Sequence, residues 1–279
     1  MQRILGNAAR RGSRTAALAL TGVALCLAAL GGASPAGAVN TKLKEEFAPF
    51  GDCPTATANF CAVSYTTGGE FHMGNKEVPI DKTITLQGGL KELLGAPQPL
   101  IPAKDGNTLS NPALKVPGGL LGVGLLEGIT GEVTATAYLA GGVEVNQLTL
   151  LQGSSGTAVI LPLKVKLDNP LLGANCWIGS DEAPIVLHLA VAKKGTEELL
   201  AKKKIIAIKG VELVDETFAV PAAKGCGALP LLTDPLVDLL AGLPAGPGHN
   251  RAVMITSFEQ AHASDVIKYD KVPKEKKKK

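Results

Sequence analysis

The chain has 279 residues, of which only 4% are aromatic, and it carries 28 Lys and Arg against 25 Asp and Glu. Its positive charge lies at the two ends. Four arginines stand in the first 14 residues, and five lysines with one glutamate make up the last six, so that residues 39–273 sum to −5. Because a nucleic-acid-binding protein needs a basic face, this distribution argues against nucleic acid as a partner.

Residues 1–38 have the three parts of a secretory signal peptide. The arginine-containing stretch is followed by an apolar run over 15–30 and then by Ala36-Gly37-Ala38, which predicts cleavage between Ala38 and Val39. An apolar run of about 16 residues is too short for a transmembrane helix, which needs roughly 20. We therefore expect a secreted, extracellular protein without a transmembrane anchor in its mature form, exported by the general secretory or the twin-arginine route.

The mature chain is predicted to form one secreted domain over residues 39–272, followed by a disordered, lysine-rich tail over 273–279. The simplest interpretation of this tail, whose last six residues are KEKKKK, is a solvated chain end. Contact between the tail and an anionic polymer of the cell wall is the alternative interpretation.

Alternating apolar and polar residues predict strands along much of the domain. In residues 157–168 (TAVILPLKVKLD) every odd-numbered position from 159 to 167 is apolar. Together with residues 130–139 and the glycine turns between the runs, this pattern predicts a three-stranded meander over 129–167. A second meander is expected over 61–80, with turns at Gly68-Gly69 and Gly74-Asn75, and further strands are expected at 184–192, 211–220 and 251–260.

One segment has the signals of a helix, residues 233–241 (TDPLVDLLA). Thr233 or Asp234 would cap it, Pro235 would lie in its first turn, and Gly242 and Pro244 would end it. The predicted fold is therefore all-β: an antiparallel β-sandwich of about nine or ten short strands, with one short helix near 233–241 and a long Pro/Gly-rich loop near 91–128.

Four cysteines remain once the signal peptide is removed, and an even number in an exported protein favours disulfides. Of the three connectivities that four cysteines allow, we predict Cys53–Cys61 and Cys176–Cys226. The first pair encloses a short loop (PTATANF), and the second joins two glycine-containing turns. Zinc is the competing interpretation, but the spacings C-x7-C and C-x49-C match no usual ligand pattern. We therefore expect no metal and no cofactor.

Cys176 is followed by Trp177, a pair that also occurs at the nucleophile of papain-like proteases. Such a site needs a histidine that activates the thiol. Three histidines lie downstream, of which His188 is expected on the wet side of a strand, His249 in a loop and His262 near the C-terminal end. The chain also lacks a G-x-S-x-G, S-x-x-K or H-E-x-x-H motif. We expect no catalytic residues and no enzyme activity.

Several stretches resemble secreted proteins that are common in filamentous, Streptomyces-type actinobacteria. These are "FGDCP" (50–54), "GEFHMGNKEVPIDKTITLQGG" (69–89), "DNPLLGANCWIGS" (168–180) and "GHNRAVMITSFEQAHASDV" (248–266). The family carries no established activity, so the resemblance implies export and disulfides but assigns no site residues.

Residues 113–129 (ALKVPGGLLGVGLLEGI) are the best candidate for a working surface. Their apolar side chains would either plug the end of the sandwich or form an exposed apolar contact surface. The function predicted from the sequence is that of a secreted non-enzymatic protein that binds cell envelope, matrix, an apolar ligand or another protein. A secreted hydrolase with an unrecognised active site is the alternative. The side chains of this candidate surface are Leu120, Leu121, Val123, Leu125 and Leu126.

Overall fold

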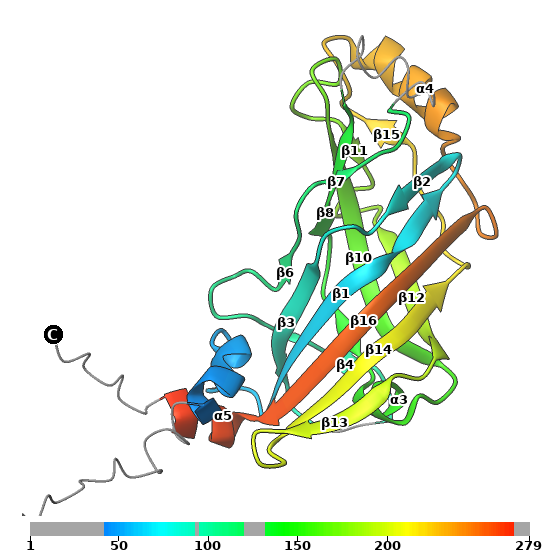
Figure 1. The fold of residues 1–279 in the computed structure, drawn as a ribbon. Coiled ribbons are helices and arrows are strands. Elements are labelled where there is room, and N and C mark those ends of the chain that lie inside the picture. The colour runs from blue at the N-terminus through cyan, green and yellow to red at the C-terminus, as the bar shows by residue number, and fades with distance from the viewer. Residues whose placement is uncertain (1–41, 93–94, 120–131, 271–279) are drawn as a thin grey trace, which may run out of the picture. The chain divides into compact units, whose positions relative to one another are not determined.

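The structure, a computed structural model, describes residues 42–92, 95–119 and 132–270 (Figure 1). All of them belong to one compact unit that spans Ala36–Lys279. The predicted signal peptide with Ala38 and Val39, the lysine-rich tail and the candidate surface from Leu120 to Leu126 lie outside the described residues. The described part holds its own apolar cores and both disulfides, as expected of a domain that folds by itself.

Six strands form the larger part of a single antiparallel sheet, in the order β10-β12-β14-β16-β1-β3. The strands β16 and β1, from opposite ends of the domain sequence, therefore lie side by side, with Phe60 opposite His262. The bounds of the six strands are β1 (Phe60–Met73), β3 (Ile84–Leu90), β10 (Thr157–Asp168), β12 (Ile185–Lys193), β14 (Ile205–Asp215) and β16 (Asn250–His262).

Short strands extend the two margins of this sheet toward each other. At the β10 margin lie β8 (Thr134–Leu139) and β9 (Glu144–Val145), and at the β3 margin lie β5 (Ile101–Pro102) and β6 (Leu109–Ser110). In turn, β4 (Gln98–Pro99) pairs with β9 and β7 (Leu114–Lys115) pairs with β8. Along residues 98–115, β4 and β7 pair at the β10 margin, whereas β5 and β6 between them pair at the β3 margin. This segment therefore connects the two margins, and the sheet is nearly closed around its interior.

The remaining elements lie at the margins and ends of the sheet (Figure 1). None of the helices in the described ranges is long and apolar enough to cross a membrane. Residues 42–47 are helical and run into η1 (Ala48–Phe50). The others are β2 (Lys76–Pro79), β11 (Trp177–Ile178), β13 (Thr196–Leu200), β15 (Ala223–Lys224), α3 (Gln147–Gln152), α4 (Pro230–Ala241) and α5 (Ala263–Asp270).

The apolar side chains form two cores. The main core fills the interior of the sheet and includes the inward-facing residues of β10, from Val159 to Leu167. A smaller core lies where the helical residues 42–50 pack beside α5, and there Phe47 stacks on Tyr269 with ring centroids 4.8 Å apart. Each core contains one disulfide, so each is tied covalently as well as by packing.

The predicted all-β, antiparallel fold is confirmed. The strands on the two sides of the core, the walls of the interior, belong to one nearly closed sheet. A sandwich would divide the strands between two sheets. Here the segment predicted as a long Pro/Gly-rich loop supplies four of the short strands that join the walls, β4 to β7. Pro99 and Pro102 are compatible with this role, because they stand in strands only two residues long at the margins of the sheet.

Two predicted meanders differ in detail. Gly68-Gly69 is not a turn: it lies within the continuous strand β1, directly after a β-bulge between Thr66 and Gly68. In the meander over 129–167 the middle strand is reduced to β9 and is followed by helix α3. The reason is local capping: the side chain of Asn146 accepts a hydrogen bond from Thr149 N, and Gly153 adopts a left-handed conformation at the other end.

Candidate functional site

The interior of the nearly closed sheet contains three apolar cavities in a row along β10. The middle cavity, of about 50 Å³, contacts Leu161, Leu163 and Val165 of this strand. A cavity of about 40 Å³ lies on the α4 side and contacts Val165 and Leu167, and one of about 30 Å³ lies at the other end and contacts Val159. The middle and α4-side cavities share four wall residues, Met73, Val78, Ala135 and Val165.

The cavities follow from the composition of the chain. Aromatic residues make up only 4% of it, so the interior is filled by aliphatic side chains. On β8 the side chains that face the middle cavity are alanines, Ala135 and Ala137, which do not reach across to the opposite wall. Apolar cavities of this kind stay dry and accept apolar guests. The interior is therefore the most obvious place in the described domain for an apolar ligand.

Few polar groups contact these cavities. In the middle cavity the polar wall residue is Asn111, whose amide nitrogen donates a hydrogen bond to Ala137 O at 2.8 Å. In the α4-side cavity it is Lys76, whose Nζ donates to Gly119 O at 3.0 Å and whose pKa is lowered by burial. Ser64 and Thr256 contact the third cavity. The described walls contain no carboxylate, histidine or thiol.

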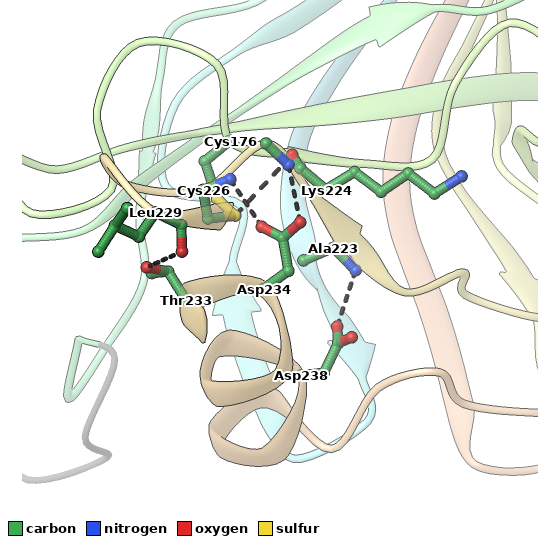
Figure 2. The surroundings of a disulfide bond; sticks show 9 residues. Cys176, Ala223, Lys224, Cys226, Leu229, Thr233, Asp234 and Asp238 are labelled. Atoms are coloured by element: carbon green, nitrogen blue, oxygen red, sulfur yellow. Dashed lines mark hydrogen bonds between the residues drawn. A yellow bond between two sulfur atoms is a disulfide. The ribbon is translucent and has the colours of Figure 1, made fainter. Parts of the chain in front are cut away.

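Helix α4 packs against one end of the sheet through polar anchors (Figure 2). The carboxylate of Asp234 accepts hydrogen bonds from Gly225 N at 3.1 Å and from Cys226 N at 2.7 Å. One turn later, Asp238 accepts a hydrogen bond from Ala223 N at 2.7 Å. The Cys176–Cys226 disulfide fixes the turn that precedes the helix, so the helix is held by its carboxylates and by a covalent link.

The opposite side of α4 exposes leucines. We define the outer leucine face as the four exposed leucines within the helix, whose exposed fractions run from 53% to 93%. Three of them, Leu232, Leu236 and Leu239, follow at spacings of four and three residues and share one side of the helix. The fourth precedes Leu232 directly, and Leu229, just before the helix, is 64% exposed as well. Scattered exposed leucines are ordinary, but a contiguous group of them indicates a contact surface. The members of the face are Leu231, Leu232, Leu236 and Leu239.

A cluster of ionisable side chains lies on the outer side of the β1–β2 hairpin. His72 Nε2 is 3.2 Å from a carboxylate oxygen of Glu70 and 3.7 Å from one of Glu77. These three residues have the donor atoms and the proximity of a divalent-metal site, with all ligand atoms within 4.8 Å. However, Arg251 reaches Glu70 at 3.5 Å and Glu216 at 2.8 Å. This guanidinium puts positive charge beside the carboxylates, so we assign the cluster as a surface ion-pair network.

The predicted disulfides are present, with Cα atoms 5.5 Å apart for Cys53–Cys61 and 4.1 Å apart for Cys176–Cys226. Cys176 is therefore no free nucleophile. Trp177 lies in β11 of the sheet, where it contacts Tyr138 edge-on, with Lys164 Nζ 5.6 Å from its ring centroid. His188 is exposed on its strand, as predicted, and His249 and His262 are exposed as well.

Comparison of the chain with protein-family models, curated proteins and solved structures finds no match.

Sequence reasoning located helix α4 but identified neither its carboxylate anchors nor its outer leucine face. The signal was present: the helix sequence PLLTDPLVDLLA has two acids and no base, and its leucines are numerous enough to occupy more than one side. The cavities were not foreseeable in the same way, because their existence depends on closure of the sheet by residues 98–115. Of the candidate surface at 113–129, Leu114 contacts the middle cavity and Val116 the α4-side cavity, whereas Lys115 and Pro117 between and after them are exposed.

Proposed function

We propose that this protein is exported and acts outside the cell as a non-enzymatic binding protein for a slender apolar ligand, such as a single alkyl or acyl chain. The row of three apolar cavities along β10 carries this proposal. The N-terminal signal-peptide pattern supports export. So do the two disulfides, since disulfides form and persist in oxidising compartments.

The size of the cavities limits the ligand. A cavity needs about 10–15 Å³ of this kind of volume for one water molecule. Each of the three, at about 30 to 50 Å³, is therefore only a few water molecules large. None of them is wide enough for a fused ring system, but their alignment favours a narrow chain. Met73 stands in the walls of two cavities, and methionine is the most adaptable of the apolar side chains.

The proposal is tested with straight-chain ligands of increasing length on the purified Ala36–Lys279 unit. Calorimetric titration should show saturable binding of one chain per protein. Affinity should rise about fourfold for each added methylene, the equivalent of about 0.8 kcal/mol, until the cavities are filled. A branched or cyclic ligand with the same number of carbons should bind more weakly, because it does not fit a narrow row.

A filling variant supplies the structural control. Ala135→Leu places a larger side chain where two cavities meet and should lower the affinity at least tenfold, whereas Ala192→Leu adds the same atoms to an exposed position of β12 and should change nothing. Where leucine overpacks the site, Ala135→Val makes the same test with less bulk. Absence of saturable binding, or binding that neither Ala135 variant weakens, would contradict the proposal.

A further inference from the structure

We propose that the outer leucine face of α4 docks onto an uncharged lipid surface and buries its leucines among the acyl chains. This inference goes beyond the proposed ligand and does not depend on it. It rests on the orientation in which α4 is held, on the residue types that its outer face presents and on the exposure of the leucines, which reaches 93% at Leu231.

The structure holds α4 with its most apolar side outward. Asp234 and Asp238 both turn toward the sheet and accept backbone hydrogen bonds there (Figure 2). The same inner side carries Val237 and Ala241, which are buried and contact the α4-side cavity. Since the only two charged residues of the helix are on its inner side, the outer leucine face has no charge of its own.

The residue types of this face fit lipid better than protein. Protein interfaces draw most of their affinity from Trp, Tyr and Arg, and leucine is under-represented among their strongest contacts. The segment PLLTDPLVDLLA contains no Trp, Tyr, Phe, Lys or Arg. Affinity for a membrane surface scales with buried apolar area plus attraction to anionic headgroups. Helix α4 offers apolar area but no basic residue that would attract anionic headgroups, so docking should not require anionic lipid.

The helix is also suited to shallow insertion without unfolding. Its backbone stays hydrogen-bonded within the helix, and the disulfide between Cys176 and Cys226 holds the preceding turn in place. No side chain has to leave the core, because the leucines that would enter the lipid are already outside. The outer leucine face would therefore already have its final structure before it docks onto lipid.

The test is vesicle flotation with the Ala36–Lys279 unit, from which the apolar N-terminal run is absent. Vesicles of phosphatidylcholine alone are compared with vesicles containing phosphatidylglycerol, each at low and at high salt. We expect binding to both lipids, with less than a twofold change between lipids and between salt concentrations.

The variant Leu231→Gln with Leu239→Gln removes the two most exposed leucines and keeps residues of high helix propensity. It should lower the partition coefficient at least about tenfold, the effect expected from the apolar burial of even one leucine. The matched control is Leu199→Gln, which changes a leucine that is 48% exposed on β13, at the end of the sheet away from α4 (Figure 1). Unchanged thermal unfolding shows that each variant is folded.

Three outcomes would overturn the inference. The first is no flotation of the wild-type unit with either vesicle. The second is flotation with anionic vesicles only, lost at high salt, which would assign the contact to the lysines of the chain. The third is concentration-dependent self-association that the paired leucine variant abolishes, without vesicle binding; in that case a second copy of the chain covers the face. Failure of ligand binding inside the sheet would leave the docking result unaffected.

Discussion

A β-bulge between Thr66 and Gly68 redirects the side chains of β1. Before the bulge in β1, even-numbered Ala62 belongs to the main core and odd-numbered Val63 to the smaller one, and after it the odd-numbered residues Phe71 and Met73 pack on the main core. The bulge therefore changes which positions face the core, as an inserted residue must in a strand with period two. Without it, Phe71 and Met73 would face outward.

We expect Gly69→Ala to destabilise the domain by about 2 kcal/mol or more, because a non-glycine residue at positive φ is strained. Gly69 has φ +108°, and a Cβ there would lie 2.0 Å from Val253 O. Its neighbour Gly68 is the matched control: a Cβ at Gly68 would come no closer than 3.6 Å, to Ile255 Cδ1. Urea unfolding of the two alanine variants makes the comparison, and an equal loss of stability in both would refute this account of Gly69.

Glu259 supplies a pH dependence. It lies on β16 between Val63 and Ala207 of the flanking strands. Burial raises the pKa of its carboxyl, an effect that nearby Lys209 opposes and Glu198 reinforces. The pKa of the Tyr65 hydroxyl is also raised, by burial and by the charge of Glu259. The folded domain therefore binds a proton at Glu259 more tightly than the unfolded chain does.

The sign of the effect follows from this difference. Where the folded state binds more protons than the unfolded state, stability falls as pH rises. The loss begins near the unfolded pKa of about 4.3 and is complete above the raised folded pKa. Glu259→Gln mimics the protonated form, so its free energy of unfolding should rise relative to wild type between pH 3.5 and pH 7.5. Urea unfolding at both pH values measures this, and a difference that is constant or reversed would contradict the assignment.

At the scale of elements, the two disulfides should contribute unequally to stability. In the chain-entropy estimate a cross-link is worth more when it closes a longer loop. The two pairs are separated by 8 and by 50 residues. Replacing Cys53 and Cys61 by alanine should lower the free energy of unfolding by about 2.5 kcal/mol, and replacing Cys176 and Cys226 by about 4 kcal/mol.

Denaturant unfolding of the two paired variants tests this order. Alkylation of the unreduced Ala36–Lys279 unit is the companion measurement and should label none of its four cysteines. A larger loss for the Cys53/Cys61 variant would mean that packing around each bridge outweighs loop closure. Uptake of alkyl groups by the unreduced protein would refute the bridges themselves.

The elements that could be predicted from the sequence are those whose signal is local. Alternation of apolar and polar residues located β10, β12 and β16, because in each the inner and outer faces differ in polarity. Helix α4 was located by Gly242, but it begins three residues earlier than expected, at Pro230. Proline is favoured in the first helical position, where its missing N–H costs nothing. Because Pro230 starts the helix, the first turn lies before Thr233, and Pro235 stands inside the helix instead of in its first turn.

The features that could not be predicted depend on residues far apart in the chain. The closure of the sheet needs β4 to pair with β9 and β6 with β3, and strands of two residues have no periodicity to detect. The buried face of α4 could not be predicted either, because its inner side is held by carboxylates that accept hydrogen bonds from the backbone of residues 223–226. In a sequence pattern, acids indicate the outer side of a helix; here they mark the inner side.

At the scale of the whole molecule, closure and composition act together. A nearly closed sheet encloses a core whose width is set by strand pairing, whereas the size of its side chains is set by the sequence. With few aromatic residues and with alanines facing inward from β8, the enclosed space exceeds what the side chains fill. Voids weaken packing, because the atoms that line them have no partner on one side. The same voids are what the proposed ligand would occupy.

The cavities predict how the domain responds to pressure. Unfolding under pressure is favoured by the elimination of internal voids, with volume changes of about −20 to −100 mL/mol. The Ala36–Lys279 unit should unfold reversibly with a volume change in this range. Ala135→Val, which fills space where two cavities meet, should make that change less negative and raise the midpoint pressure. The exposed counterpart Ala192→Val should leave both unchanged.

A saturating alkyl chain should act in the same direction as Ala135→Val, because it fills the same space and stabilises the folded state by mass action. High-pressure tryptophan fluorescence can follow the unfolding, since Trp177 is the only tryptophan of the chain. If the ligand raises the midpoint pressure of the wild type but not that of Ala135→Leu, the cavities and the binding site are the same space. If it raises both equally, the ligand binds elsewhere, and the interior voids are only a consequence of closing a sheet around small side chains.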